Sequence, residues 1–203
     1  MKALIMVDVQ NDFLPGGALE VPEGDRVIPV LNRIQDRFDL VVATQDWHPE
    51  GHSSFASQHP GKKAFEKIDW KGHPQMLWPD HCIQGSRGAE ISDRLDTKRV
   101  EAIFRKGTDR EIDSYSGFYD NHHQRSTALA DYLRGKGVDR VFISGLALDV
   151  CVYFTALDSL KEGFETTLIE DASQGLDENA IKNALQKIQD AGGRVVSAIQ
   201  ENF

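Results

Sequence analysis

The sequence predicts an α/β protein of three layers, in which a mostly parallel six-stranded sheet carries helices on both faces. Short apolar segments rich in β-branched residues alternate with helical patterns along the chain. Most of these segments are apolar throughout rather than at every second residue, which is typical of strands buried on both sides. The length of 203 residues fits a single domain, residues 1–203.

The elements follow one another in regular order. Segments such as ALIMVDV and VDRVFIS have the composition of buried strands, and glycines such as Gly135 and Gly163 stand where the helices should stop. The expected strands are 3–9, 40–44, 100–104, 138–144, 166–170 and 194–199. The expected helices are 25–37, 125–135, 149–162 and 177–191. Alternation of strand and helix implies right-handed crossovers and therefore parallel strands.

One long segment, about residues 46–85, departs from this alternation. It contains all three tryptophans and five of the seven histidines of the chain. Linkers are not rich in tryptophan, and long ordered loops are usually functional. We therefore expect an irregular insertion that contributes to a metal-binding site.

Charge and composition exclude several classes of protein. With 23 basic and 32 acidic side chains, the net charge of −9 argues against a nucleic-acid partner. No apolar run approaches the ~20 residues of a membrane helix, and MKALIMVDVQ is apolar for too few residues to be a signal peptide or anchor. Two cysteines cannot form a disulfide framework, so we expect a reduced, cytoplasmic protein. A homo-oligomer is left open.

Four reactive side chains fall at the carboxyl ends of four predicted strands. Asp8 lies near the end of the first strand and Asp46 after the second, while Lys106 and Cys151 follow the third and fourth. Ligands of open parallel sheets bind beyond this edge. We therefore expect the four side chains to share one site.

Cys151, Asp8 and Lys106 have the chemistry of a nucleophile, a base and an orienting cation. A thiol in the first turn of a helix meets the positive end of the helix dipole, which favours thiolate, and nearby N–H groups can hold an oxyanion. The alternatives are an inert packed cysteine and a structural ion pair between Asp8 and Lys106.

The insertion offers a second group of ligands. Asp46 and His48 are two residues apart, so in extended chain both side chains point to one side. Either His52 or His81 can complete a site of one carboxylate and two imidazoles, which suits zinc, manganese or iron. The alternative is a chance cluster of histidines in a polar loop. Cys82 is interpreted as packing.

Five ordered segments carry a family resemblance. They are MVDVQNDFLPGGAL, TQDWHPEGHSSFASQHP, LWPDHCIQGSRGAE, FRKGTDREIDSYSGF and GLALDVCVYFTALDS. Spanning residues 6–159, they resemble the nicotinamidase/pyrazinamidase branch of the isochorismatase-like hydrolases. The resemblance implies an amidohydrolase that converts nicotinamide to nicotinate and ammonia, and also accepts pyrazinamide, through a cysteine thioester. It further implies a role in pyridine nucleotide salvage.

The resemblance also implies roles for residues of this chain. The catalytic triad would be Asp8, Lys106 and Cys151, and the metal ligands would be Asp46, His48 and His81. The further expected site residues are Ser54 (to the metal through water), His52 (a less certain neighbour of the metal), and Phe13, Trp78, Tyr115 and Ala147 (the substrate pocket). A cis peptide bond is expected between Ala147 and Leu148, with the N–H groups of Leu148 and Cys151 facing the oxyanion. This chain has Leu148 where the family commonly has threonine and Val150 where it commonly has an aromatic residue.

Other functions are kept as alternatives. A related cysteine hydrolase could act on another small amide or ureido compound, of the N-carbamoyl or ureidoacrylate type. A metal-sensing or redox-sensing α/β protein without catalysis would use the same cysteine and histidines. A nucleotide-binding module is disfavoured, because DVQNDFLPGG follows the first strand where a glycine-rich phosphate turn would be needed.

Overall fold

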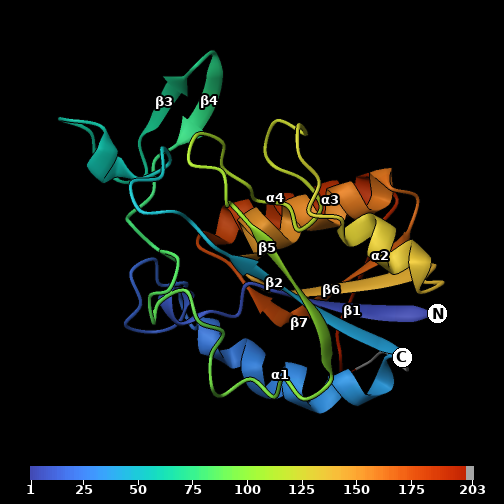
Figure 1. The fold of residues 1–203 in the computed structure, drawn as a ribbon. Helices are drawn as coiled ribbons and strands as arrows, with labels where there is room; N and C mark the ends of the chain where they lie inside the picture. The colour runs from blue at the N-terminus through green and yellow to red at the C-terminus, as the bar shows by residue number, and fades with distance from the viewer. Residues whose placement is uncertain (200–203) are drawn as a thin grey trace.

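A parallel sheet of six strands forms the middle layer of the computed structural model, which describes residues 1–199 (Figure 1). The spatial order is β5-β2-β1-β6-β7-β8, and all five neighbouring pairs are parallel. The strands are β1 (Lys2–Val7), β2 (Leu40–Asp46), β5 (Val100–Lys106), β6 (Arg140–Leu146), β7 (Glu165–Gln174) and β8 (Arg194–Val196). Each lies where the sequence predicts a strand, so the predicted fold class is confirmed.

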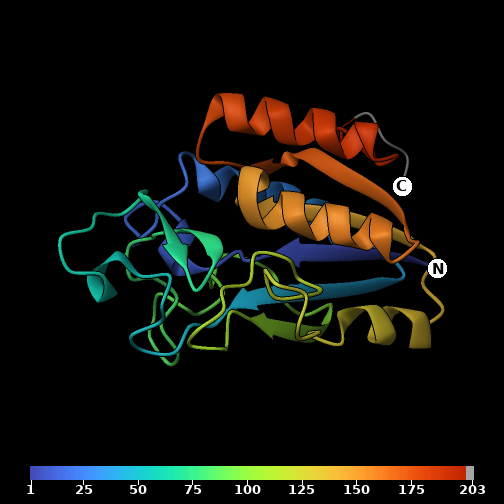
Figure 2. The ribbon, with the colours of Figure 1, turned by 90° about the horizontal axis from the view of Figure 1, so that it is seen from above.

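Helices cover both faces of the sheet (Figures 1 and 2). The helix α1 (Val27–Ile34) packs on one face together with Leu4 and Met6 of β1. The helices α2 (Leu129–Gly135), α3 (Tyr153–Lys161) and α4 (Glu178–Asp190) pack on the other face, which β1 meets through Ala3, Ile5 and Val7. Both sets of β1 side chains are therefore buried, which explains why this strand is apolar throughout.

The helices are shorter than the sequence predicts. Short 3-10 turns, Gly24–Arg26 and Gln35–Arg37, flank α1, and α2 begins at Leu129 rather than at 125. The helix α4 begins at a side-chain cap, in which Asp177 accepts a hydrogen bond from the N–H of Ala180 at 2.8 Å. Caps and short turns of this kind shift helix ends without changing the order of the elements.

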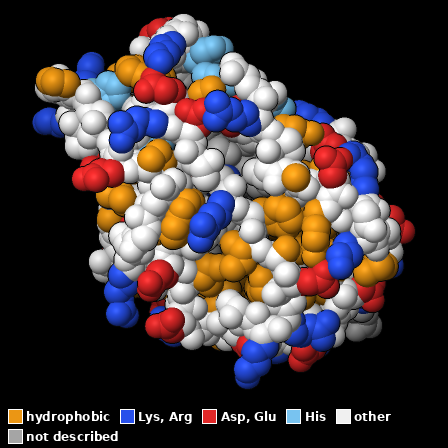
Figure 3. All heavy atoms as spheres, viewed as in Figure 1, with side chains coloured by type: hydrophobic (Ala, Val, Ile, Leu, Met, Phe, Trp, Pro, Cys, Tyr) orange, Lys and Arg blue, Asp and Glu red, His pale blue; other side chains and the backbone are white. Residues whose placement is uncertain are grey.

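β5 differs from the interior strands because it forms an edge of the sheet. Its side chains alternate between exposed and partly buried, and Ile103 is 49% exposed. Figure 3 shows hydrophobic side chains gathered over the middle of the face on which β5 lies. The apolar composition of this segment predicted a strand but not its half-exposed position.

The insertion lies beyond the carboxyl ends of the strands, as Figure 2 shows. It is mostly irregular, but it contains an antiparallel hairpin of β3 (Lys67–Trp70) and β4 (His73–Met76) that the sequence analysis did not predict. Most hairpin side chains are exposed or half-buried, so no apolar run marks these strands. Among residues 1–199, no helix combines the length and apolar character needed to cross a bilayer.

Candidate active site

The structure brings Asp8, Lys106 and Cys151 together at the carboxyl edge of the sheet. Asp8 follows β1, Lys106 is the last residue of β5, and Cys151 lies in the π-turn Leu148–Val152 that follows β6. The Lys106 Nζ atom lies 2.9 Å from Asp8 Oδ2 and 3.4 Å from Cys151 Sγ. All three side chains are buried. A carboxylate, an ammonium and a thiol thus meet in a space shielded from water.

Asp8 is held in place by one hydrogen bond and one ion pair. Its backbone adopts a left-handed conformation, with φ of 49°, where the chain turns away from β1. The Thr44 hydroxyl donates to Oδ1 at 2.6 Å, and the Lys106 ammonium lies against Oδ2. Burial raises the pKa of Asp8, and the charge of Lys106 opposes that rise. Asp8 is therefore a more basic carboxylate than one in water.

The surroundings of Cys151 raise the pKa of its thiol, which is opposite to the effect expected from a helix dipole. Burial raises the pKa of Cys151 well above its ordinary value; Lys106 lowers it, while the carboxylates of Asp8 and Asp46 raise it again. The helix α3 begins only at Tyr153, so Cys151 lies in the turn before it rather than in the first turn of an α-helix. The thiol therefore needs a base, and Asp8 is the candidate, because Lys106 contacts both its carboxylate and the Cys151 sulfur.

The cis peptide bond lies one residue earlier than expected. It joins Leu146 to Ala147, not Ala147 to Leu148. β6 ends at Leu146, so the cis bond stands at the junction between this strand and the turn. The carbonyl of Ala147 accepts the N–H groups of Val150 and Val152, at 3.0 and 3.1 Å.

Asp46, His48 and His81 converge on one point beside the triad. The Nε2 atoms of His48 and His81 lie 3.1 and 3.4 Å from Asp46 Oδ2. The Nδ1 atom of His48 lies 3.0 Å from the carbonyl oxygen of Gly107, and that of His81 lies 2.7 Å from the carbonyl oxygen of Pro79. A carbonyl only accepts, so each Nδ1 donates to its carbonyl, and Nε2 is the nitrogen of each ring that would be free to bind a metal ion.

This donor set fits a divalent metal ion. One ligand atom from each of the three residues lies within 4.8 Å of the others, and all three side chains are buried. Two imidazole nitrogens and a carboxylate oxygen are ligands that zinc, manganese and iron accept. Burial would raise the pKa of Asp46, but His48 and Lys106 hold it well below its ordinary value, so the carboxylate is ionised.

The potential metal ligands Asp46, His48 and His81 are called the metal group below. Asp46 connects this group to the triad of Asp8, Lys106 and Cys151. Its Oδ1 atom accepts a hydrogen bond from Lys106 Nζ at 3.0 Å, while Oδ2 faces the two histidines. Lys106 also donates to the carbonyl of Ser114 at 3.0 Å. Lys106 thus neutralises one carboxylate of each group, and the pKa of its ammonium is raised well above the ordinary value, since Asp46 and Asp8 outweigh the effect of burial.

His52 and Ser54 lie beside the metal group and bind each other. The Ser54 hydroxyl donates to His52 Nδ1 at 2.8 Å, and the rings of His52 and His48 are 4.3 Å apart between centroids. Burial and the nearby His48 lower the pKa of His52. His48, His52 and Asp113 also form a second group whose ligand atoms lie within 4.8 Å. The water-mediated role of Ser54 stays a prediction.

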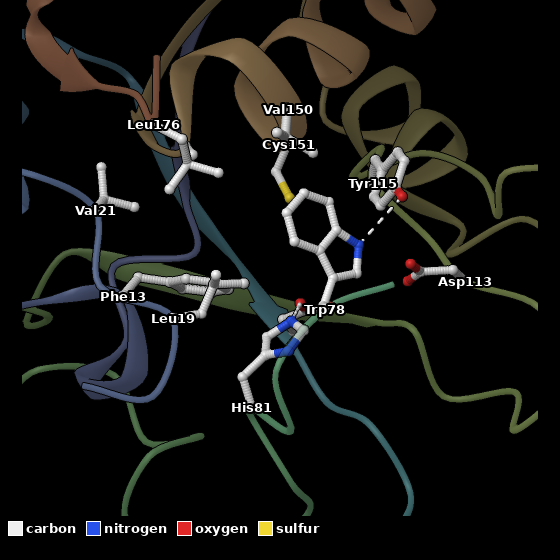
Figure 4. Close-up of a pocket in the computed structure, with 12 residues that line it drawn as sticks. Phe13, Leu19, Val21, Trp78, His81, Asp113, Tyr115, Val150, Cys151 and Leu176 are labelled. Carbon is white, nitrogen blue, oxygen red and sulfur yellow. Dashed lines mark hydrogen bonds and ion pairs between the residues drawn. The ribbon is translucent and has the colours of Figure 1, made fainter. Parts of the chain in front are cut away.

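A narrow cavity opens next to both groups (Figure 4). About 370 Å³ of space, part of it open to solvent, lies between its walls, which include Cys151 and the potential metal ligands Asp46 and His81. The other lining residues are Phe13, Leu19, Val21, Trp78, Asp113, Tyr115, Ala147, Val150 and Leu176. The four pocket residues expected from the sequence, Phe13, Trp78, Tyr115 and Ala147, are all in this wall, whereas Leu148 packs in the core on the α2–α4 side of the sheet.

Part of the pocket wall could not be predicted from the sequence. Leu19, Val21 and Leu176 are apolar residues of irregular segments, and nothing in one sequence marks them as pocket residues. Asp113 was also missed. Its carboxylate accepts a hydrogen bond from Gln75 Nε2 of β4 at 3.1 Å, which ties the hairpin to the pocket. Pairing of β4 with a loop 38 residues away has no local sequence signal.

Gly107 is required beside the metal group, and a substitution tests this. Its φ is +65°, and an added Cβ would lie 2.5 Å from His48 Cε1 and 3.0 Å from Asp46 Oδ1. Gly107→Ala is therefore expected to displace His48 and to weaken metal binding about 10–100-fold, measured by titration calorimetry with zinc. Gly61→Ala is the matched control, because Gly61 also has positive φ but has nothing within 4 Å of an added Cβ. Equal zinc affinity of the two variants would contradict this role.

The fold and the site together define a class of hydrolase, and the chain belongs to the isochorismatase family, whose domain matches residues 2–200. It is 46% identical to the nicotinamidase of Acinetobacter baylyi over 197 residues, which cover 97% of this chain and 92% of that protein. A solved nicotinamidase and pyrazinamidase of Acinetobacter baumanii superposes with a TM-score of 0.95 at 45% identity, covering 98% and 96% of the two chains. The pyrazinamidase of Pyrococcus horikoshii, solved with zinc, gives a TM-score of 0.79 at 40% identity, covering 97% and 98%.

Proposed function

We propose that this chain is a nicotinamidase that hydrolyses nicotinamide to nicotinate and ammonia and acts on pyrazinamide in the same way. The observation that carries the proposal is that a buried Asp–Lys–Cys group and a buried Asp–His–His group face one aromatic cavity. Such a cavity suits a flat heteroaromatic ring. The similarity to curated nicotinamidases along nearly the whole chain supports this assignment.

The roles of the triad follow from its contacts. Asp8 takes the proton of Cys151 as the sulfur forms a bond to the carboxamide carbon. The C–N bond then breaks, and Asp8 returns the proton to the departing nitrogen, which leaves as ammonia. Water next attacks the thioester and gives one proton to Asp8, which passes it to the departing sulfur and so restores the thiol. Nicotinic acid leaves and loses its remaining proton to the solvent, where ammonia takes it up. Lys106 keeps Asp8 ionised and stays charged throughout.

Backbone N–H groups of the turn after β6 stabilise the oxyanion. Cys151 and Ala147 both line the cavity, so their N–H groups are candidates, beside that of Leu148 named from the resemblance. A donor aimed at the developing oxyanion typically contributes about 10²–10³ in rate. Since the donor is backbone, a leucine at 148 in place of threonine leaves that function available.

Asp46, His48 and His81 hold the metal in this proposal, with zinc as the first choice and manganese or iron as alternatives. A bound divalent metal supplies Lewis acidity toward the ring nitrogen of the substrate. Asp46 stays ionised beside Lys106, and the two histidines keep the tautomer fixed by Gly107 and Pro79. The zinc-bound pyrazinamidase of Pyrococcus horikoshii supports the choice of metal.

We further infer a single hydrolase domain over residues 1–203 that works in the cytoplasm on a small-molecule substrate. Its two cysteines are buried and unpaired, which suits a reducing compartment. The net charge of −9 does not favour a nucleic-acid partner.

Ammonia release tests the proposed function directly. Zinc-loaded protein is expected to release ammonia from nicotinamide and pyrazinamide but not from N-carbamoyl compounds at comparable rates. Removal of the metal with a chelator is expected to abolish release, and added zinc to restore it, because the ring would lose its anchor. Turnover that is unchanged in the metal-free protein would contradict the role of Asp46, His48 and His81.

A further inference from the structure

A second, wider compartment adjoins the narrow cavity. The four residues Trp78, Tyr115, Val150 and Leu176 belong to the walls of both, so the two compartments meet at these side chains. The space between the walls is about 1500 Å³ in the outer compartment and about 370 Å³ in the inner one, and part of each is open to solvent. Nicotinamide itself would use only the inner space, and the outer one has no role in the proposed reaction.

The passage between the compartments has fixed walls. On one side, Trp78 Nε1–H donates to the Tyr115 hydroxyl at 3.2 Å (Figure 4). On the other side, both carboxylate oxygens of Asp149 accept backbone N–H groups, from Leu176 at 3.0 Å and from Asp177 at 3.1 Å. These bonds tie the backbone at Leu176 and Asp177 to the turn that contains Asp149 and Val150. The opening is therefore a built feature of the site.

The outer compartment continues the aromatic wall of the inner one. Phe65 lies edge-on to Trp78, with 5.9 Å between ring centroids, and Phe154 of α3 lies 5.4 Å from Tyr115. These two phenylalanines are 58% and 39% exposed, and they are two of the five large hydrophobic side chains that the described residues leave exposed. Exposed aromatic side chains that flank a cavity are characteristic of a binding surface.

The charges of this compartment disfavour an anionic ligand. Its charged lining residues are Glu20, Lys67, Asp149 and Asp177. Three acids against one base repel a carboxylate or phosphate, while the neutral aromatic edges accept an apolar group. The aromatic edges therefore favour an apolar group that is joined to a ring in the inner cavity, and the acids disfavour an anionic one.

We propose that the outer compartment binds an apolar substituent on the substrate ring, so that the enzyme also hydrolyses aryl-substituted pyridine carboxamides with the substituent between Phe65 and Phe154. This inference rests on the proposed function and names a wider substrate class for it. Phe65 and Phe154 act as specificity residues that touch only the substituent. Their contacts stabilise the bound substrate and the transition state equally, so loss of these contacts changes KM rather than kcat.

The test compares nicotinamide with nicotinamides that carry phenyl at ring carbon 4, 5 or 6. At least one phenyl compound is expected to release ammonia, and the double variant Phe65→Ala/Phe154→Ala is expected to raise its KM about tenfold, as loss of apolar contact predicts. The same variant is expected to leave the kinetics of nicotinamide unchanged. Ile103→Ala, which removes another exposed apolar side chain on β5, is the matched control and is expected to change neither substrate. A carboxyphenyl compound is expected to be a poorer substrate than its phenyl counterpart.

The outcomes separate the two proposals. Hydrolysis of nicotinamide without hydrolysis of any phenyl compound, or with a phenyl KM that the double variant leaves unchanged, would overturn the inference and leave the proposed function standing. Failure to hydrolyse nicotinamide itself, with metal bound, would overturn both.

Discussion

Cys151→Ala is expected to reduce ammonia release from nicotinamide by about 10⁴-fold or more, because the thioester cannot form without the sulfur. The neighbouring groups would remain in place, since Lys106 still bonds to Asp46 and to the Ser114 carbonyl. The fold should therefore survive, with a thermal midpoint close to that of the parent protein. The measurement is steady-state ammonia release, accompanied by a thermal melt and a zinc titration.

Cys82→Ala provides the matched control. Cys82 is also buried and unpaired, and the pKa of its thiol is likewise raised well above the ordinary value, by burial and by Asp46 and Asp12. However, its backbone N–H bonds to Asp12 Oδ2 at 2.7 Å, and its side chain does not line the cavity. We expect this variant to keep its turnover. Substantial activity in Cys151→Ala, or an equal loss in both variants, would remove Cys151 from the mechanism.

The raised pKa of the Cys151 thiol also predicts how fast this cysteine reacts with an alkylating agent. A buried thiol is alkylated slowly at neutral pH, and the reaction accelerates as the pH rises toward its pKa. Both cysteines share this property, so iodoacetamide should modify neither quickly at pH 7, as followed by mass spectrometry. Rapid alkylation of Cys151 alone at pH 7 would show a resting thiolate and contradict the need for Asp8 as base.

The fold could be predicted from the sequence because its signals are local. A strand buried on both faces, such as β1, must be apolar throughout, and each helix must follow its strand. The same rule predicts that Asp8, Lys106 and Cys151 lie at one edge of the sheet. Position at an edge follows from topology alone, which is why these residues could be found in a single sequence.

The rest of the site depends on contacts between segments that are far apart in the chain. The tautomers of His48 and His81 are set by carbonyls of Gly107 and Pro79, and the pKa of Cys151 is set by burial among carboxylates from two other strands. The expectation of thiolate failed because it considered only the local helix dipole. The cis bond was misplaced by one residue because the strand end that positions it is a tertiary feature.

Lys106→Met is expected to cause the largest loss of stability of any single change in the site. The Lys106 ammonium is fully buried and lies 2.9 Å from Asp8 and 3.0 Å from Asp46. Its removal leaves two buried carboxylates without their cation, which typically costs about 3–5 kcal/mol of unfolding free energy. Ammonia release should also fall to background, since Asp8 would then hold its proton. Lys98→Met, at an exposed lysine, is the control and should leave both stability and turnover unchanged.

The pH dependence of this loss distinguishes a charge effect from a packing defect. Burial and Asp46 raise the pKa of Asp8, and Lys106 is the principal group that lowers it, so the folded-state pKa of Asp8 rises further in Lys106→Met. A carboxyl group whose pKa is higher in the folded than in the unfolded state binds protons preferentially when folded, so folding is favoured at low pH and weakened as the pH rises. The difference in unfolding free energy between parent and variant should therefore shrink from pH 8 to pH 5, measured by urea denaturation. If the difference in unfolding free energy is constant over this range, Lys106 contributes packing alone. That result would contradict the proposal that Lys106 keeps Asp8 ionised.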